Sequence, residues 1–261
     1  MTEITTIESL SAATQVQGQV LAGGTLLMRE VNYRPETVPH LVRLTDPALR
    51  VINRASGKIS IGAGVTMAQI IDNSDLAPLA PAARAIGGPA IRNMATVGGN
   101  LFAPHPYGDL TTALLALGAQ VQWADGRLED LEAFLTNRAN ARGVVAAVLI
   151  DPPHGDGLRF AKVCRTKPKG VSVLSIAVLI ESMGRTVNSA RVAFGAMGPT
   201  PIRSKAAEAA LTGTTLDASG VAAACAACVN DLAPIDDALA SAWYRREVAP
   251  IHLRRLLLGE N

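Results

Sequence analysis

Two glycine-rich turns are the part of this sequence best suited to binding a ligand. They read Gly23-Gly24-Thr25 and Thr96-Val97-Gly98-Gly99-Asn100. Adjacent glycines allow consecutive backbone N–H groups to point into one concavity, which holds a phosphate without a basic side chain. The threonines and the asparagine add side-chain donors, and Asp109 is an acceptor suited to a ribose hydroxyl or an amino group. The pair of turns predicts a shared pyrophosphate site, with two ordinary tight turns as the alternative.

The best-known nucleotide-binding motifs do not match this chain. After Gly62-Ala63-Gly64, Met67 stands where a Rossmann G-x-G-x-x-G fingerprint needs its third glycine. The sequence also has no P-loop glycine turn followed by lysine. A conventional NAD domain and a phosphate-splitting ATPase are therefore disfavoured.

The histidines and cysteines predict neither a metal site nor a catalytic side chain. No pair of histidines has metal-ligand spacing; they are His40, His105, His154 and His252. Cys225 and Cys228 have C-x-x-C spacing within an alanine-rich stretch, where we expect them to pack, because an iron–sulfur cluster needs about four thiolates. His105 lies in the glycine-rich passage of residues 87–109. We expect a solvated loop histidine there, with a role at the ligand as the alternative.

Composition predicts a soluble, globular, cytoplasmic chain. It has 261 residues, a formal net charge of +2 and 49% hydrophobic residues. The near-balanced charge disfavours nucleic-acid binding. Glu3 and Glu8 stand where a signal peptide would be basic and then apolar, and the apolar stretches fall short of the roughly 18 to 20 residues that span a bilayer. Only 3% of residues are aromatic, so backbone and glycine must hold any planar ligand.

Hydrophobic periodicity predicts an α+β protein, because the second half of the chain has strands followed by helices. The glycine turns and Asp109 must be positioned by short strands and helices in the first half. In that half we expect helices over residues 5–16, 66–71, 78–86 and 111–118, and strands over 20–22, 40–44, 58–62 and 119–123. After a boundary at 151–157 we expect strands over 158–163, 171–181 and 189–195, and helices over 203–211, 217–232 and 236–258.

The last of these helices is basic. It carries Arg245, Arg246, Arg254 and Arg255. We expect these arginines to form a solvated face, with contact to a partner subunit as the alternative.

Several long runs resemble one known family, the FAD-binding medium subunits of molybdenum hydroxylases. That group includes xanthine dehydrogenase, aldehyde oxidoreductase and carbon monoxide dehydrogenase. The similar runs are LAGGTLLM at 21–28, IGAGVTMAQI at 61–70, residues 91–121 with ATVGGN, RFAKV at 159–163, residues 190–211 with GPTPIR, and WYRREVAPIHLRRLL at 243–257.

The resemblance implies a fold of two domains. The first would be a PCMH-type, or vanillyl-alcohol-oxidase type, FAD-binding domain over residues 1–155, with two α+β lobes at about 1–55 and 56–155. The second, over residues 156–261, would resemble the C-terminal domain of carbon monoxide dehydrogenase flavoproteins, with a three-stranded antiparallel sheet and helices.

The resemblance also implies which residues hold the flavin. The two loops would embrace the FAD phosphates and ribityl chain, Asp109 would match an acidic FAD contact, and Lys162 would reach the flavin region. The implied contacts are Val20, Leu21, Ala22, Gly23, Gly24, Thr25, Leu26, Leu27, Thr96, Val97, Gly98, Gly99, Asn100, Ala103, Asp109 and Lys162. Leu26 and His105-Pro106 depart from the family pattern, which commonly has an acidic or amide residue and Ser-Pro at these positions.

The implied function is electron transfer within a larger enzyme. Electrons from [2Fe-2S] clusters in a small partner subunit would pass through FAD to an external acceptor, while a large partner subunit would carry the molybdopterin cofactor. A dimer of such heterotrimers is one possible assembly. The alternatives are a freestanding FAD oxidoreductase of the same fold and a structural subunit that has lost FAD.

Overall fold

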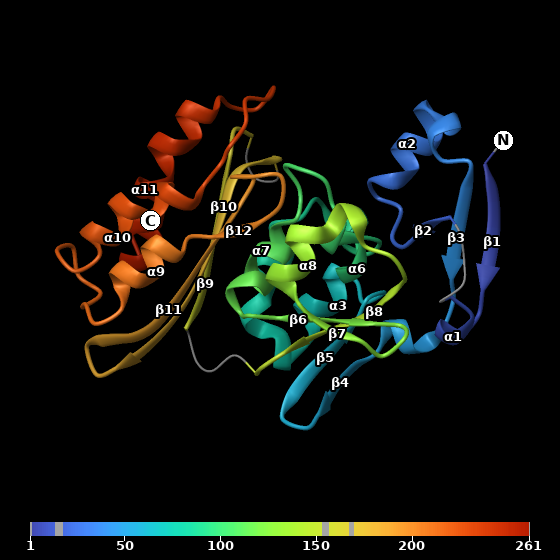
Figure 1. The fold of residues 1–261 in the computed structure, drawn as a ribbon, viewed down its shortest axis with the longest axis horizontal. Coiled ribbons are helices and arrows are strands. Elements are labelled where there is room, and N and C mark those ends of the chain that lie inside the picture. The colour runs from blue at the N-terminus through green and yellow to red at the C-terminus, as the bar shows by residue number, and fades with distance from the viewer. Residues whose placement is uncertain (1, 14–17, 153–156, 167–169, 261) are drawn as a thin grey trace.

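The computed structural model describes residues 2–13, 18–152, 157–166 and 170–260. Within these residues the chain forms three separate β-sheets, and helices pack around them. Figure 1 shows the sheets arranged along the long axis, with the N-terminal strands at one end and the C-terminal helices at the other. The prediction of a mixed α and β protein is confirmed.

The first sheet is small and parallel. Its strands are β1 (Glu3–Ile7), β3 (His40–Leu44) and β2 (Gln19–Leu21), in that order, with α1 (Leu10–Ala13) and α2 (Leu27–Tyr33) between them in the chain. The helix predicted over residues 5–16 is therefore wrong at its start, because Thr5 and Thr6 pair with β3 instead. Residues 14–17 lie outside the described residues.

The second sheet is antiparallel and carries the first half of the core. Its order is β4 (Ile52–Ala55), β5 (Lys58–Gly62), β8 (Val145–Ile150), β6 (Gln120–Trp123) and β7 (Leu128–Asp130). β4 and β5 form a hairpin, so residues 52–55 belong to this sheet and not to the first.

Short helices connect these strands. They are α3 (Met67–Asp72), α4 (Ala80–Arg84), α5 (Pro89–Arg92), α6 (Val97–Leu101), α7 (Asp109–Ala116) and α8 (Leu131–Asn137), with 3₁₀ turns at Pro35–Thr37, Pro47–Arg50, Ser74–Leu79 and Arg138–Asn140. Thr66 and Gln69 form a capping box at the start of α3, the helix predicted over residues 66–71. All eight residues of α7 are buried, so this helix is enclosed on every side.

The third sheet has the order β12 (Ile202–Arg203), β11 (Thr186–Gly195), β10 (Ser172–Met183) and β9 (Leu158–Cys164), all antiparallel. The described residues thus give four strands where three were expected, because residues 202–203 return to pair with β11. The helices α9 (Lys205–Leu211), α10 (Ala222–Ala227) and α11 (Ala242–Leu258), with a 3₁₀ turn at Cys228–Asp231, cover one face of this sheet, and α7 packs against the other (Figure 1).

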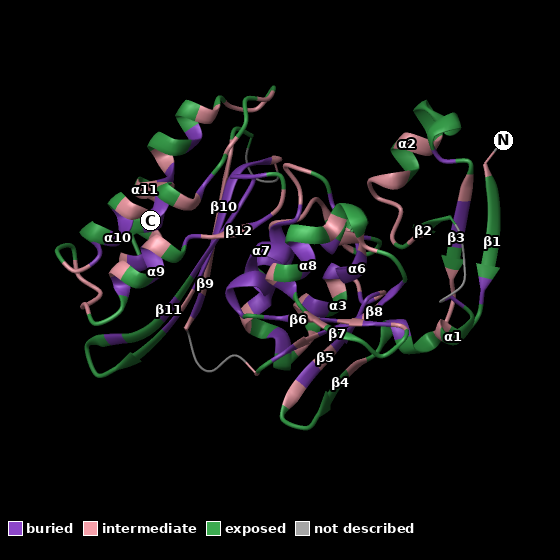
Figure 2. Cartoon of the chain, viewed as in Figure 1, coloured by how far each residue is buried: buried purple, intermediate pink, exposed green. Residues whose placement is uncertain are grey.

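β10 is buried on both faces because it lies between these layers (Figure 2). Ile176 and Val178 belong to the core formed with the C-terminal helices. Ala177 belongs instead to the core that contains α7 and the second sheet. One continuous apolar core therefore joins the second sheet to the inner face of the third.

Candidate functional site

The two glycine loops lie against each other in the structure. A Cβ added to Gly23 would overlap the backbone carbonyl of Met94, just before the second loop. A Cβ on Gly99 would lie 3.8 Å from the Cβ of Ala22, in the first loop. The absence of a side chain at Gly23 is what permits this approach. The structure therefore brings together two turns that are far apart in the sequence.

The first loop presents unpaired backbone donors. It runs from the end of β2 to the start of α2, and the backbone N–H groups of residues 23–27 meet no hydrogen-bond acceptor among the described residues. Leu26 is the N-cap of α2 and makes no side-chain capping bond. Successive free N–H groups in a glycine turn are suited to an anion such as phosphate. The Leu26 side chain has no polar atom to offer a ligand, so the polar groups at this position of the loop are the backbone N–H groups.

The second loop is pinned to the turn that follows β5. Val97 N donates to Val65 O at 2.9 Å, and Gly98 N donates to Ala63 O at 2.8 Å. The Thr96 hydroxyl accepts from Gly99 N at 3.1 Å, so this side chain caps α6. The Thr96 and Val97 side chains are both buried, so they pack beneath the surface of the loop and do not line it.

Asn100 links this loop to α7. Its Oδ1 accepts from the backbone N and from the hydroxyl of Thr111, both at 2.9 Å. This side chain was predicted to donate to a ligand, and the structure shows its oxygen engaged in orienting α7. The contact fixes where Asp109, the first residue of α7, lies relative to the glycine loops.

Asp109 and Lys162 form a buried ion pair with each other. Lys162 Nζ, on β9, lies 2.8 Å from Asp109 Oδ2 and also donates to Ala85 O at 2.9 Å. The Ser172 hydroxyl donates to the other carboxylate oxygen at 2.6 Å. The side chains are 7% and 13% exposed for the aspartate and the lysine. Because an ammonium group has three N–H donors, Lys162 retains one beyond these two contacts.

Sequence reasoning missed Ser172 and Arg138. Ser172 begins β10, and nothing in its local sequence marks it as a partner of α7. Arg138 Nη1 donates to Leu101 O at 3.0 Å and to Ala103 O at 2.8 Å, so it fixes the exit of the second loop. Burial lowers the pKa of Arg138 from its usual value.

Large apolar side chains are exposed on the segments that surround the two loops. Single exposed apolar residues are ordinary, but here several lie on the segments that carry the free N–H groups and the close loop contact. They are Val20 at 37%, Met28 at 36%, Ile91 at 41%, Met94 at 56% and Phe102 at 44% exposure. A ligand with both phosphates and a flat apolar ring matches this combination.

The two loops, with free backbone N–H groups among the described residues and exposed apolar side chains beside them, define a class of proteins that bind a phosphate-bearing ligand with an apolar ring. The chain belongs to the family described as the FAD binding domain in molybdopterin dehydrogenase, whose model matches residues 3–150. Residues 159–259 match a second model, the C-terminal domain of CO dehydrogenase flavoproteins. The chain is thus an FAD-binding medium subunit of the molybdenum hydroxylase family, as its sequence predicted.

Known proteins of this family resemble the chain over most of its length. The carbon monoxide dehydrogenase medium chain of Afipia carboxidovorans is 30% identical over 90% of this chain and 86% of its own. The 6-hydroxypseudooxynicotine dehydrogenase complex subunit alpha of Paenarthrobacter nicotinovorans is 29% identical over 92% and 85%. Among solved structures, reconstituted CO dehydrogenase from Oligotropha carboxidovorans has a TM-score of 0.87 at 26% identity, covering 98% of this chain and 96% of the matched chain.

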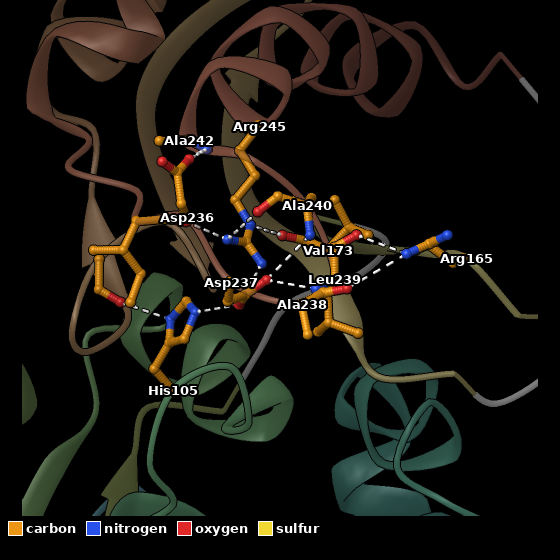
Figure 3. Close-up of polar contacts among 12 residues, drawn as sticks. His105, Arg165, Val173, Asp236, Asp237, Ala238, Leu239, Ala240, Ala242 and Arg245 are labelled. Carbon is orange, nitrogen blue, oxygen red and sulfur yellow. Dashed lines mark hydrogen bonds and ion pairs between the residues drawn. The ribbon is translucent and has the colours of Figure 1, made fainter.

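His105 is not the solvated loop residue that was expected. Its ring Nδ1 lies 3.1 Å from Gly198 O, and Nε2 lies 3.0 Å from Asp237 Oδ2 (Figure 3). The side chain is only 13% exposed. The histidine therefore connects the segment between α6 and α7 to the C-terminal part of the chain.

Arg245 is also not on the solvated face predicted for the last helix. The side chain is fully buried and pairs with Asp237 at 2.8 Å, while its Nε donates to Val173 O at 2.9 Å. It occupies the same helix face as Ala249, Leu253 and Leu257, which are buried at intervals of four residues. That spacing is the sequence signal that would have placed Arg245 inside.

The ionised Asp237 carboxylate contributes to the stability of the fold, and this contribution is lost at low pH. Burial alone would raise the pKa of Asp237, but hydrogen bonds from Arg245, two backbone N–H groups and the neighbouring imidazole outweigh burial and hold it well below the usual carboxyl range. A carboxyl with a lowered folded-state pKa stabilises the fold above about pH 4 and loses that contribution as pH falls further. We expect Asp237→Asn to be less stable than the wild type at pH 7, with a gap that narrows as pH falls below about 4. Chemical unfolding at a series of pH values measures this gap, and a gap independent of pH would contradict the assignment.

The two C-x-x-C cysteines are packed in the core, as expected. Cys225 and Cys228 are buried in the cluster beneath the C-terminal helices. Burial raises the pKa of Cys228 to about 12, and it raises that of Cys225 against an opposing effect of Arg254. We expect a thiol reagent at neutral pH to modify the half-buried Cys164 first and to reach the other two only when the chain unfolds. Rapid labelling of Cys228 in the native protein would contradict this.

No helix among the described residues is both long enough and apolar enough to cross a bilayer. In the same part of the chain, no group of three or more histidine, cysteine, aspartate or glutamate side chains could hold a metal ion.

Proposed function

We propose that this chain binds FAD between its two glycine loops and passes electrons through it, from [2Fe-2S] clusters of a small partner subunit to an external acceptor. Two observations carry the proposal: the backbone N–H groups of residues 23–27 meet no hydrogen-bond acceptor among the described residues, and this loop lies against the second loop. When bound, FAD supplies the redox chemistry through its isoalloxazine ring. The chain's own residues bind and orient it.

The loops have distinct roles in this proposal. The first loop, residues 20–27, holds phosphate oxygens through its backbone, and Gly99 leaves room for close approach of the ligand at the second. A Cβ at Gly99 would lie 3.1 Å from Thr96 Oγ1, which is a tight contact, and 3.8 Å from the Cβ of Ala22 in the first loop, so a larger side chain there would crowd the approach between the loops. The Asp109–Lys162 ion pair joins the start of α7 to β9. In this proposal one lysine N–H is available to a ligand.

The domain division is also part of the proposal. We place a PCMH-type FAD-binding domain of two lobes at about residues 1–155 and a C-terminal domain at 156–261. Because β4 pairs with β5, we place the division between the lobes ahead of β4 rather than after residue 55.

The partners proposed are a small iron–sulfur subunit and a large molybdopterin subunit, with a dimer of heterotrimers as one possible assembly. The relatives named as CO dehydrogenase medium chains support a multi-subunit enzyme. The three cysteines are free, which fits a cytoplasmic location. In this arrangement the substrate is oxidised in the large subunit and not in this chain.

Purification and flavin titration test the proposal. We expect the chain to copurify with two further subunits and to carry non-covalent FAD that can be removed and replaced. Flavin uptake without any copurifying subunit would favour a freestanding oxidoreductase. A chain that takes up no added FAD would instead be a structural subunit, and the relay proposal would be wrong.

A further inference from the structure

The segment from the second glycine loop to α7, residues 102–108, is fixed at both ends. At its start, Arg138 donates to the carbonyls of Leu101 and Ala103. At its end, Asp109 is held by Lys162 and Ser172. The middle of the segment has a separate attachment, through His105, to a different part of the chain.

Both ring nitrogens of His105 face oxygen atoms that can only accept a hydrogen bond. Nδ1 lies 3.1 Å from the carbonyl oxygen of Gly198, and Nε2 lies 3.0 Å from the carboxylate of Asp237. A carbonyl and a carboxylate have no hydrogen to donate, and a neutral imidazole has only one N–H. Both contacts are made together only when the ring carries a proton on each nitrogen, as imidazolium.

One acceptor of His105, the Asp237 carboxylate, is itself held by several hydrogen bonds. Asp237 Oδ2 accepts from Arg245 at 2.8 Å as well as from the histidine, and its Oδ1 accepts from the N–H groups of Leu239 and Ala240 (Figure 3). Arg165, on the chain that follows β9, donates to the carbonyls of residues 238 and 239. The carboxylate therefore stands between two cations and cannot move away from either without losing several bonds.

We propose that His105, as an imidazolium, is a positioning residue for the flavin site. It ties the segment that leaves the second glycine loop to Gly198 and Asp237, so that the loop and Asp109 keep one arrangement relative to the third sheet. The proposal rests on the proposed FAD function. It adds that flavin affinity depends on a contact with residues 198 and 237, which lie outside the two glycine loops.

Flavin titration of variants of the full chain tests this role. The FAD-free protein is titrated with FAD and followed by quenching of flavin fluorescence. His105→Phe keeps a ring of similar size and removes both donors, and Asp237→Asn removes the carboxylate. We expect each to raise the FAD dissociation constant by about tenfold, which corresponds to the binding-competent arrangement falling to roughly a tenth of the FAD-free molecules. The two effects on the dissociation constant should be less than additive in the double variant, because both changes remove the imidazolium–carboxylate contact. Asp237→Asn also removes the charge that pairs with Arg245.

A matched control is available on α11. His252→Phe makes the same exchange at a half-buried histidine of the C-terminal part and should leave the dissociation constant unchanged. Wild-type affinity in His105→Phe, or an equal loss in His252→Phe, would overturn the positioning role.

A second measurement reads the protonation of His105 in the wild type and does not depend on flavin. The chain is labelled with ¹⁵N-histidine, and the ring signals that move in Asp237→Asn are assigned to His105. We expect both ring nitrogens to carry a proton in the FAD-free wild type, in the buffer of the titration. One unprotonated nitrogen would overturn the imidazolium tie even if FAD binds. Conversely, a wild type that takes up no FAD while both nitrogens are protonated would refute the proposed function, and with it the flavin role of His105, but not the tie.

Discussion

We expect Gly99→Val to abolish FAD binding while leaving the chain folded. Its backbone is helical, which valine can adopt. An added Cβ lies in ordinary contact with Ala22 at 3.8 Å but only 3.1 Å from the Thr96 hydroxyl, which must shift by a few tenths of an ångström. The two further methyl groups then crowd the region between the loops, where the ligand must approach. A loss of affinity of at least about a hundredfold is expected, which corresponds to roughly 2.7 kcal/mol. Flavin absorbance of the purified variant and FAD titration measure it.

The control for this change is Ala226→Val, on an exposed position of α10. It adds valine where no ligand is proposed and should alter stability by less than about 1 kcal/mol. Circular dichroism and thermal unfolding show whether each variant is folded. Full FAD content in a folded Gly99→Val protein would mean that the ligand does not pass between the loops.

We expect Lys162→Met to cause the largest loss of stability of any variant considered. Methionine preserves much of the length of the lysine, but it leaves Asp109 with only the Ser172 hydroxyl as a side-chain donor. Removing one partner of a buried ion pair costs about 3 to 5 kcal/mol, because the remaining charge is desolvated and uncompensated. The free energy of unfolding in urea, without flavin, measures this loss.

The matched control is Lys205→Met. Lys205 pairs with Glu132 at 2.8 Å, but its side chain is 64% exposed. An exposed pair contributes between about 0 and 1 kcal/mol. If the two variants lose the same stability, the Asp109–Lys162 pair has no special part in joining α7 to β9.

The local features of this fold were predictable from sequence, and the long-range ones were not. The glycine loops and the Thr66 cap depend on a few consecutive residues, so their chemistry is visible in the chain. β1 was mistaken for a helix because its side chains are mostly exposed and give little periodicity, and its strand geometry depends on pairing with His40 and its neighbours.

The structure brings the two glycine loops together, but it gives the predicted polar side chains contacts that differ from those expected. Asp109 and Lys162 were each expected to meet the ligand, and the structure pairs them with one another. Nothing local in the sequence indicates that residues 53 positions apart, on α7 and β9, will meet. The same limit hid Ser172, Arg138 and the partners of His105, whose roles exist only once three sheets are packed together.

Because α7 is buried on every side, the two halves of the chain should unfold together. Two family models divide the chain between residues 150 and 159, yet α7 contributes to the apolar core on the first side and packs directly against β10 and β11 on the second. Separating the halves would expose an entire apolar helix to water. Amide hydrogens of α7 and β10 should therefore exchange with solvent together, in one opening event, so that the evolutionary boundary of this protein is not a boundary of its cooperativity.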